Sequence, residues 1–207
     1  MSDAAATFDG YEKRPDAALR VILRHYGVRK KKGKVLQKKT FVFMAIAGVV
    51  VLLDQLTKGW IIATLRLHEG FPVIDGFFNI VHVRNPGAAF GFLAGASPAF
   101  RSVFFIAVTL VAILLILHYL RHALLPTAVE KLPLVFPLSL ILAGAVGNLI
   151  DRIRFGEVVD FLDVYVGAHH WPAFNVADAS ISTGAALLVI ALFVARKERE
   201  AGTGSAD

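Results

Sequence analysis

Hydrophobic residues gather into four long blocks along this chain, and polar residues are concentrated between the blocks. Each block is close to the length of about 20 apolar residues with which a helix crosses a hydrocarbon layer of about 30 Å. A helix in a soluble core would instead carry a polar stripe at the 3.6-residue period, and the blocks show none. The sequence therefore predicts an all-α membrane protein with four transmembrane helices, at residues 41–65, 103–120, 132–150 and 179–195.

Two charged residues, Asp54 and Lys58, fall inside these blocks, and both lie in the first one. They are four positions apart with the acid first, a spacing at which side chains pair on one helical face. We therefore expect a structural ion pair that braces a nearby site. The composition agrees with a membrane protein, since 56% of the residues are hydrophobic and only 18% are charged.

The chain contains no cysteine, which excludes a disulfide framework, a thiol nucleophile and a cysteine-based zinc site. It also excludes a lipid anchor attached to this chain through cysteine. Because no ligand spacing such as HExxH is present, no metal and no other cofactor is expected.

The distribution of Lys and Arg predicts how the helices are oriented in the membrane. The tract RKKKGKVLQKK at residues 29–39 holds seven of the 22 Lys and Arg residues and precedes the first block. The segments 62–99 and 152–176 hold only two each. The positive-inside rule then places both termini in the cytoplasm and the two longer loops outside. Further basic residues lie on the cytoplasmic side of this arrangement: Arg121, Lys131, Arg196, Lys197 and Arg199.

The N-terminal region is strongly basic, with 11 of the 22 Lys and Arg residues in its first 39 positions. A cationic tract beside an apolar block is attracted to the anionic cytoplasmic leaflet, so no nucleic-acid partner is expected. The tract also imitates a secretory signal peptide, but the apolar run continues through DQLTKGW without a small-residue cleavage site, which predicts an uncleaved anchor. We expect a basic cytoplasmic extension at residues 1–39, a four-helix membrane domain at 40–196 and a cytoplasmic tail at 197–207.

The first outer segment, residues 70–93, is rich in β-formers bounded by Gly and Pro, and residues 77–84 partly alternate. This pattern predicts a small β-rich element at the outer membrane surface, because unpaired strands are not tolerated in hydrocarbon. The stretch NPGAAFG at residues 85–91 lacks the spacing and the Lys of a phosphate loop, which favours a turn. We expect Gly87 to be a structural residue of this turn.

Four carboxylates from three segments are expected at one level of the membrane: Asp54, Asp151, Asp160 and Asp178. Ionisable groups near hydrocarbon are costly, so they usually pair with one another or mark a reaction or transport site. Two carboxylates held close together share a proton and can hydrolyse an amide, one as general base and the other as acid. Because no GxSxG nucleophile motif is present, the residue types favour acid–base hydrolysis, but their spacing leaves open which two aspartates act.

Structural roles are also available to these acids. Asp178 precedes the last block, where an acid can cap a helix N-terminus. Asp151 lies beside Arg152 and close to Asn148, an arrangement that favours an interfacial ion pair or hydrogen-bond network. Other polar residues of this region are expected in solvent or in loops: Asp163, His169 and His170.

Five motifs occur in order and with suitable gaps: DQLTK (54–58), NPGAAFG (85–91), GNLIDR (147–152), VVDF (158–161) and FNVADAS (174–180). At these residues the chain resembles lipoprotein signal peptidase, also called signal peptidase II, a bacterial inner-membrane aspartyl protease. The resemblance covers about residues 41–196. Pro86 departs from the usual turn sequence of the family, and the basic N-terminal extension is longer than usual.

The resemblance implies that Asp160 and Asp178 form the catalytic pair. It implies that four other residues line the site and hold the substrate backbone or the peptide antibiotic globomycin: Asn85, Asn148, Arg152 and Asn175. The family cleaves a prolipoprotein just before a cysteine that carries diacylglyceryl. The expected partners are therefore a diacylglyceryl-prolipoprotein, membrane lipid and a globomycin-type inhibitor. A monomer is expected, in the bacterial inner membrane, with its active site near the periplasmic face.

Two other classes of protein place acids in membranes. A proton-coupled transporter would show mid-membrane acids and internal repeats, whereas here the acids are expected at one end of the helices and no repeat is visible. An assembly protein with buried ion pairs would tolerate exchange of Asp for Asn wherever the fold survives. The resemblance and the placement of the acids favour the peptidase.

Overall fold

The computed structural model describes residues 17–87, 93, 95–123 and 134–203. The chain divides into two units, residues 1–38 and 39–207, and the described part of the first is helical from Ala17 onward. The elements and the site described below lie in the second unit, except for residues 17–38 of the first helix. Residues 88–91 of the NPGAAFG motif and residues 132–133 of the third apolar block lie outside the described residues.

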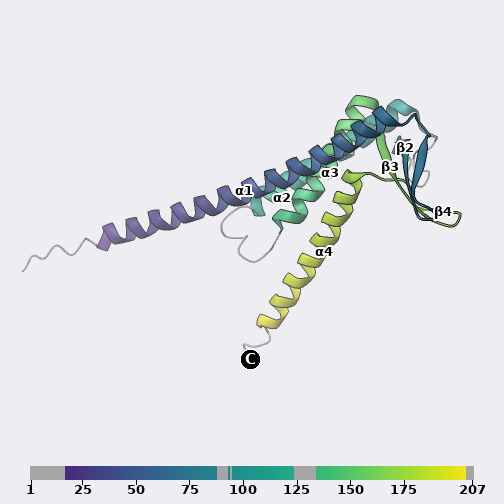
Figure 1. Cartoon of the computed structure of the whole chain (residues 1–207). Helices are drawn as coiled ribbons and strands as arrows, with labels where there is room; N and C mark the ends of the chain where they lie inside the picture. Colours follow the sequence, from purple (N-terminus) through teal and green to yellow (C-terminus); the bar gives the residue numbers. More distant parts are fainter. Residues whose placement is uncertain (1–16, 88–92, 94, 124–133, 204–207) are drawn as a thin grey trace, which may run out of the picture. The chain divides into compact units, whose positions relative to one another are not determined.

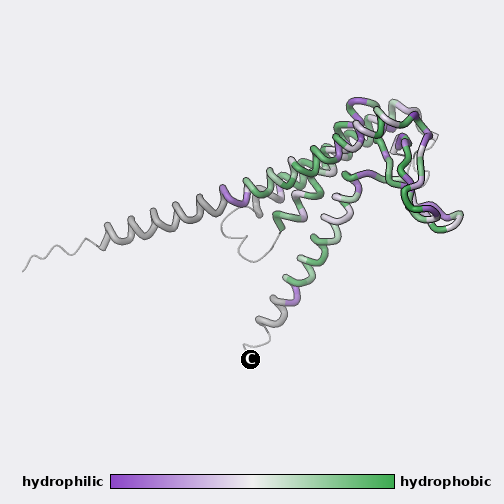
Figure 2. The backbone as a smooth tube through the Cα atoms, in the orientation of Figure 1, coloured by the Kyte–Doolittle hydropathy of each residue, from purple (hydrophilic) through white to green (hydrophobic). Residues whose placement is uncertain are grey.

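Four helices carry the candidate membrane spans (Figure 1). They are α1 (Ala17–Thr64), α2 (Pro98–Ala123), α3 (Val135–Phe155) and α4 (Val176–Thr203). Each contains a stretch long and apolar enough to cross a membrane, which confirms the prediction of four transmembrane helices. Figure 2 shows these stretches as largely hydrophobic. The spans are Gln37–Thr64, Pro98–Tyr119, Val135–Phe155 and Val176–Lys197.

Helix α3 has the most buried of the four spans. In the 18-residue apolar stretch of its span, 61% of the residues are buried, whereas no residue is buried in the corresponding stretch of α2. It packs against both α2 and α4. Many large apolar side chains of α1, α2 and α4 remain exposed, as is expected of surfaces that face lipid. The main apolar cluster consists of Phe43, Leu134, Leu138, Leu142 and Ala191.

Glycines let α3 approach α1 and α4 closely. A Cβ atom added at Gly147 would lie 2.5 Å from Asp54 Oδ2 and 3.3 Å from the Ala177 side chain. One added at Gly184 of α4 would lie 2.7 Å from the Pro137 carbonyl oxygen of α3. Small residues of this kind allow helix backbones to pack tightly in membranes.

A four-stranded antiparallel sheet has the strand order β1-β2-β3-β4. Strands β1 (Gly70–Ile74) and β2 (Phe78–Asn85) confirm the β-rich element predicted from the first long loop. The second half of the sheet, β3 (Val158–Val166) and β4 (His169–His170), was not predicted. The start of β3 is buried on both faces, so its sequence does not alternate between apolar and polar residues. A strand of this kind resembles a continuous apolar run and lacks the usual strand pattern.

Three polar residues of this region differ from their predictions. His169 and His170 do not lie in a loop but form β4, which pairs with the end of β3. Asp163 is buried rather than solvated. Its Oδ2 accepts a hydrogen bond from Asn79 at 2.8 Å, and its Oδ1 lies 2.8 Å from His170 Nδ1. The pairing of β2 with β3 brings Asn79 to Asp163, and the β3–β4 hairpin brings His170 to it. The prediction of a loop at residues 169–170 did not include this hairpin.

Candidate active site

Asp160 lies on β3 with 1% of its surface exposed. Its Oδ1 accepts a hydrogen bond from Asn175 Nδ2 at 2.7 Å, and its Oδ2 accepts one from Asn85 Nδ2 at 3.0 Å. Asn85 ends β2, and Asn175 immediately precedes α4. Two amide groups from separate elements therefore hold both oxygens of this carboxyl group.

Asp178 lies in the first turn of α4. Its Oδ1 accepts a hydrogen bond from Asn148 Nδ2 at 2.7 Å, and its Oδ2 accepts one from the backbone N–H of Asn175 at 3.3 Å. The Asn175 side chain in turn accepts a hydrogen bond from the Asp178 N–H at 2.9 Å. This reciprocal arrangement is a capping box, in which Asn175 is the cap and Asp178 its partner.

The amides of Asn148 and Asn175 connect the two carboxyl groups. Asn175 Nδ2 lies 3.3 Å from Asn148 Oδ1, so a side-chain bridge runs from Asp160 through Asn175 and Asn148 to Asp178. Burial, reinforced by the nearby charge of Asp178, raises the pKa of Asp160 to about 7 despite the hydrogen bonds from its amide donors. Such a pair retains a proton near neutral pH.

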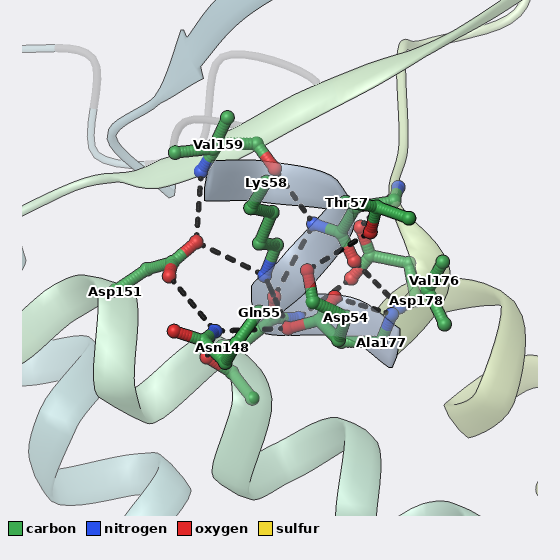
Figure 3. Close-up of polar contacts among 12 residues, drawn as sticks. Asp54, Gln55, Thr57, Lys58, Asn148, Asp151, Val159, Val176, Ala177 and Asp178 are labelled. Carbon is green, nitrogen blue, oxygen red and sulfur yellow. Dashed lines mark hydrogen bonds and ion pairs between the residues drawn. The ribbon is translucent and has the colours of Figure 1, made fainter. Parts of the chain in front are cut away.

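Lys58 of α1 is a buried cation near this pair, with 2% of its side chain exposed. Its Nζ lies 2.9 Å from Asp54 Oδ2 and 3.0 Å from Asp151 Oδ2, and it donates to Asn148 Oδ1 at 3.1 Å (Figure 3). All three donors of the ammonium group thus have partners. The expected pairing of Asp54 with Lys58 is present, and the partner of Asp151 is Lys58 of another helix.

The two acids that contact Lys58 also bind the backbone. Asp54 Oδ1 accepts a hydrogen bond from the Ala177 N–H at 2.9 Å, in the first turn of α4 (Figure 3). That N–H has no partner within its own helix. Asp151 Oδ2 accepts one from the Val159 N–H at 3.1 Å, beside Asp160 on β3. The Lys58 cluster therefore connects α1 and α3 to the two segments that carry Asp160 and Asp178.

Gln55 is a member of this cluster that the sequence did not single out. Its Nε2 lies 3.1 Å from Asp54 Oδ2, 3.2 Å from the Gly147 carbonyl oxygen and 3.2 Å from Asp151 Oδ1. Its position within DQLTK was the only available signal, and its partners on α3 are more than 90 positions away in the chain.

Gly87 and Arg152 both lie close to the Phe105 ring. Gly87 has a φ of +88°, and its N–H donates to Asn85 Oδ1 at 2.9 Å, which orients the amide that binds Asp160. A Cβ atom at Gly87 would collide with the Phe105 ring. The Arg152 guanidinium lies 5.5 Å from the centre of that ring, and its charge interacts with those of both Asp178 and Asp160. All the predicted site residues therefore lie in one contiguous region.

Comparison with known proteins decides the family. The sequence profile described as signal peptidase (SPase) II matches residues 46–194, which contain every residue of this region. The chain belongs to the signal peptidase II family. It is therefore an aspartic-type protease with multiple candidate membrane spans.

Named relatives and a solved structure agree with the assignment to signal peptidase II. The lipoprotein signal peptidase of Syntrophus aciditrophicus is 56% identical over 164 residues, which cover 79% of this chain and 99% of the relative. That of Geobacter metallireducens is 50% identical over 158 residues, covering 76% and 93%. A solved bacterial membrane enzyme is 37% identical with a TM-score of 0.62, covering 73% of this chain and 92% of its own.

Proposed function

We propose that this signal peptidase II cleaves diacylglyceryl-modified prolipoproteins just before the lipidated cysteine, with Asp160 and Asp178 as its catalytic dyad. The names of the relatives support a prolipoprotein substrate. The observation that carries the dyad is the amide bridge through Asn175 and Asn148, which connects the buried carboxyl group of Asp160 to the partly buried one of Asp178, with no cation in direct contact with either among the described residues.

The dyad activates water by acid–base chemistry. With one proton shared between the two groups, the ionised carboxylate removes a proton from water as the water oxygen attacks the scissile carbonyl carbon. The protonated carboxyl group donates its proton to the carbonyl oxygen, which gives a tetrahedral intermediate. Collapse of the intermediate breaks the C–N bond: the carboxyl group that took a proton from water gives it to the leaving amine, and the other carboxylate takes a proton from a hydroxyl group of the intermediate. The dyad again holds one proton, in its starting arrangement. The pKa of Asp160 near 7 supports this sharing of one proton.

Asn85, Asn148, Arg152 and Asn175 are proposed to hold the substrate peptide around the dyad. Arg152 has the clearest capacity, because its guanidinium forms no hydrogen bond within the described parts of the chain and retains its donors for peptide carbonyl oxygens. A globomycin-type peptide inhibitor would engage the same donors. The structural residues, Asp54, Lys58, Asp151 and Gly87, act by positioning these groups.

The proposed orientation places both termini in the cytoplasm of a bacterium and the dyad near the periplasmic face of its inner membrane. Asp151 lies near the end of α3 and Asp178 at the start of α4, so both lie at the same end of the helices. A site at the membrane surface lets the acyl chains of the substrate stay in lipid while its peptide enters between the helices. The enzyme is proposed to act as a monomer.

Turnover of a diacylglyceryl prolipoprotein peptide by the purified enzyme tests the dyad. Asp160→Asn and Asp178→Asn are each expected to lower the rate by at least about 10²- to 10⁴-fold, because each removes one proton-transfer group. Asp163→Asn is the matched control, with the same chemical change on the same strand, and should retain most activity. Near-wild-type cleavage by either of the first two variants would remove that residue from the dyad.

Cysteine labelling tests the orientation separately. In intact cells, an impermeant thiol reagent is expected to modify a cysteine introduced at Gly167 but not one introduced at Thr127. The opposite labelling pattern would reverse the proposed topology.

A further inference from the structure

A pocket lies between the end of β2, the first turns of α2 and the end of α3. Its volume is about 290 Å³, just below the range of about 300–1,000 Å³ for ligand pockets. This volume suits a polar headgroup better than a long acyl chain. The residues that line it include Pro86, Pro98, Ser102, Phe155 and Glu157.

Arg84 brings a positive charge close to this pocket, and one of its hydrogen-bond donors has no partner among the described residues. It precedes Asn85 on β2, and successive side chains of a strand point to opposite faces, so it lies on the face away from Asp160. Its guanidinium stacks 4.4 Å from the centre of the Phe155 ring, which is a wall of the pocket. Its Nη1 is buried and has no hydrogen-bond partner among the described residues.

Arg101 of α2 has an unpaired donor of the same kind among the described residues. It immediately precedes Ser102, which lines the pocket, and its Nε is also buried without a partner in the described ranges. Neither Arg84 nor Arg101 forms an ion pair with any described carboxylate. A buried charged donor without an acceptor is destabilising, and an arginine fork is well matched to the oxygens of a phosphate.

The level of the pocket relative to the membrane indicates which class of phosphate compound is available to it. The candidate span of α2 begins at Pro98, and that of α3 ends at Phe155, so the pocket lies where both helices leave the hydrocarbon layer. At that level of a bilayer the abundant phosphates belong to lipid headgroups. Arg154, which is exposed and lies 4.7 Å from the same Phe155 ring, adds further positive charge.

Glu157 adds the opposite charge to the same pocket. It is partly buried and forms no ion pair with a described residue. We propose that this pocket binds a zwitterionic phospholipid headgroup of the phosphatidylethanolamine type. The phosphate is held by Arg84, with Arg101 as a second cation, and the ammonium group by Glu157. The bound lipid would steady the end of β2, which carries Asn85 into the candidate active site.

Lipid retention by the purified full chain tests the proposal. The protein is equilibrated in detergent with equimolar phosphatidylethanolamine and phosphatidylglycerol of identical acyl chains, and retained lipid is counted by native mass spectrometry. Wild type should retain one phosphatidylethanolamine in preference. Arg84→Gln should weaken retention by about tenfold, since it removes a charged hydrogen-bond donor. Glu157→Gln should abolish the preference between the two lipids.

Arg66→Gln is the matched control, because Arg66 is 91% exposed and pairs with Glu69 outside the pocket. It should leave retention unchanged. Unaltered retention in Arg84→Gln, or a preference of wild type for phosphatidylglycerol, would overturn the proposal. Displacement of the lipid by millimolar inorganic phosphate would also overturn it, because the site would then bind a free anion. If Arg84→Gln does not fold, a tenfold loss in Arg101→Gln supports the proposal and unaltered retention refutes it.

Discussion

Four aspartates of the site region form two pairs, and the pairs differ in the groups that contact their carboxyl oxygens. Asp54 and Asp151 both contact the ammonium group of Lys58. Asp160 and Asp178 are instead held by neutral amides. A cation in contact with a carboxyl group favours its charged form, whereas burial beside a second acid disfavours that form. The same residue type therefore serves structure in one pair and is suited to chemistry in the other.

The largest effect on stability is expected when the Lys58 cation is removed. Lys58→Met leaves Asp54 and Asp151 buried without their counter-charge, and breaking a buried ion pair in this way costs about 3–5 kcal/mol. The variant is expected to unfold at a markedly lower temperature in detergent. Adding Asp54→Asn and Asp151→Asn to Lys58→Met removes the stranded charges and should restore part of the loss. No recovery in this triple variant would contradict the charge-based account.

An intermediate effect on stability is expected when a single acid, Asp160 or Asp151, is exchanged for its amide. Burial and Asp178 raise the pKa of Asp160 from 3.8 to about 7, so the folded state binds a proton that the unfolded state has lost. The contribution of Asp160 to stability is therefore fully present below pH 4 and is lost as the pH rises toward about 7.

Relative to wild type, Asp160→Asn should accordingly gain about 1–3 kcal/mol of unfolding free energy between pH 4 and pH 8. Asp151→Asn should show no such gain between the two pH values. It weakens the contact with Lys58, so it should be less stable than wild type at both. Thermal unfolding of the three proteins across this range provides the measurement. Parallel stability curves for Asp160→Asn and wild type would show that the carboxyl group is not held protonated.

The smallest expected effect is on the pH dependence of catalysis. If the dyad needs one proton, kcat/KM should fall as the pH rises through an apparent pKa near 7, because the general acid is then lost. The hydrogen bond from Asn85 favours the charged form of Asp160, so Asn85→Ala should move this alkaline limb to higher pH. An alkaline limb that stays in place or moves to lower pH would contradict this role of Asn85.

The apolar blocks predicted the four spans because each helix must match the membrane thickness, and that signal is strong in a single sequence. The sheet was only half predicted. Strand β3 is buried on one face against Ile61 through Val159, and it carries the polar site on the other through Asp160. A strand with both faces covered has no alternating pattern, so its pairing with β2 could not be inferred from local residues.

The sequence predicted which residue types make up the candidate site, but not most of the contacts between them. The ion pair of Asp54 with Lys58 follows from helical spacing, whereas the contacts of Lys58 with Asp151 and Asn148 depend on how α3 packs on α1. Long-range contacts of this type leave no periodic signal. The same limit explains why Gln55 was missed, since nothing in its neighbourhood indicates a partner on another helix.

The pairing of Lys58 with Asp54 within one helix also bears on how the protein enters the membrane. At the time α1 is inserted, its partners on α3 have not yet been synthesised, because the chain emerges from its N-terminus. An ammonium group or a carboxylate alone at that depth would oppose insertion by about 2.5–3.5 kcal/mol. Since Asp54 lies one turn from Lys58, α1 brings its own counter-ion and can partition into the bilayer as a nearly neutral segment. Asp151 can then join the pair when α3 follows, so the charged centre is assembled in the order in which the chain is made.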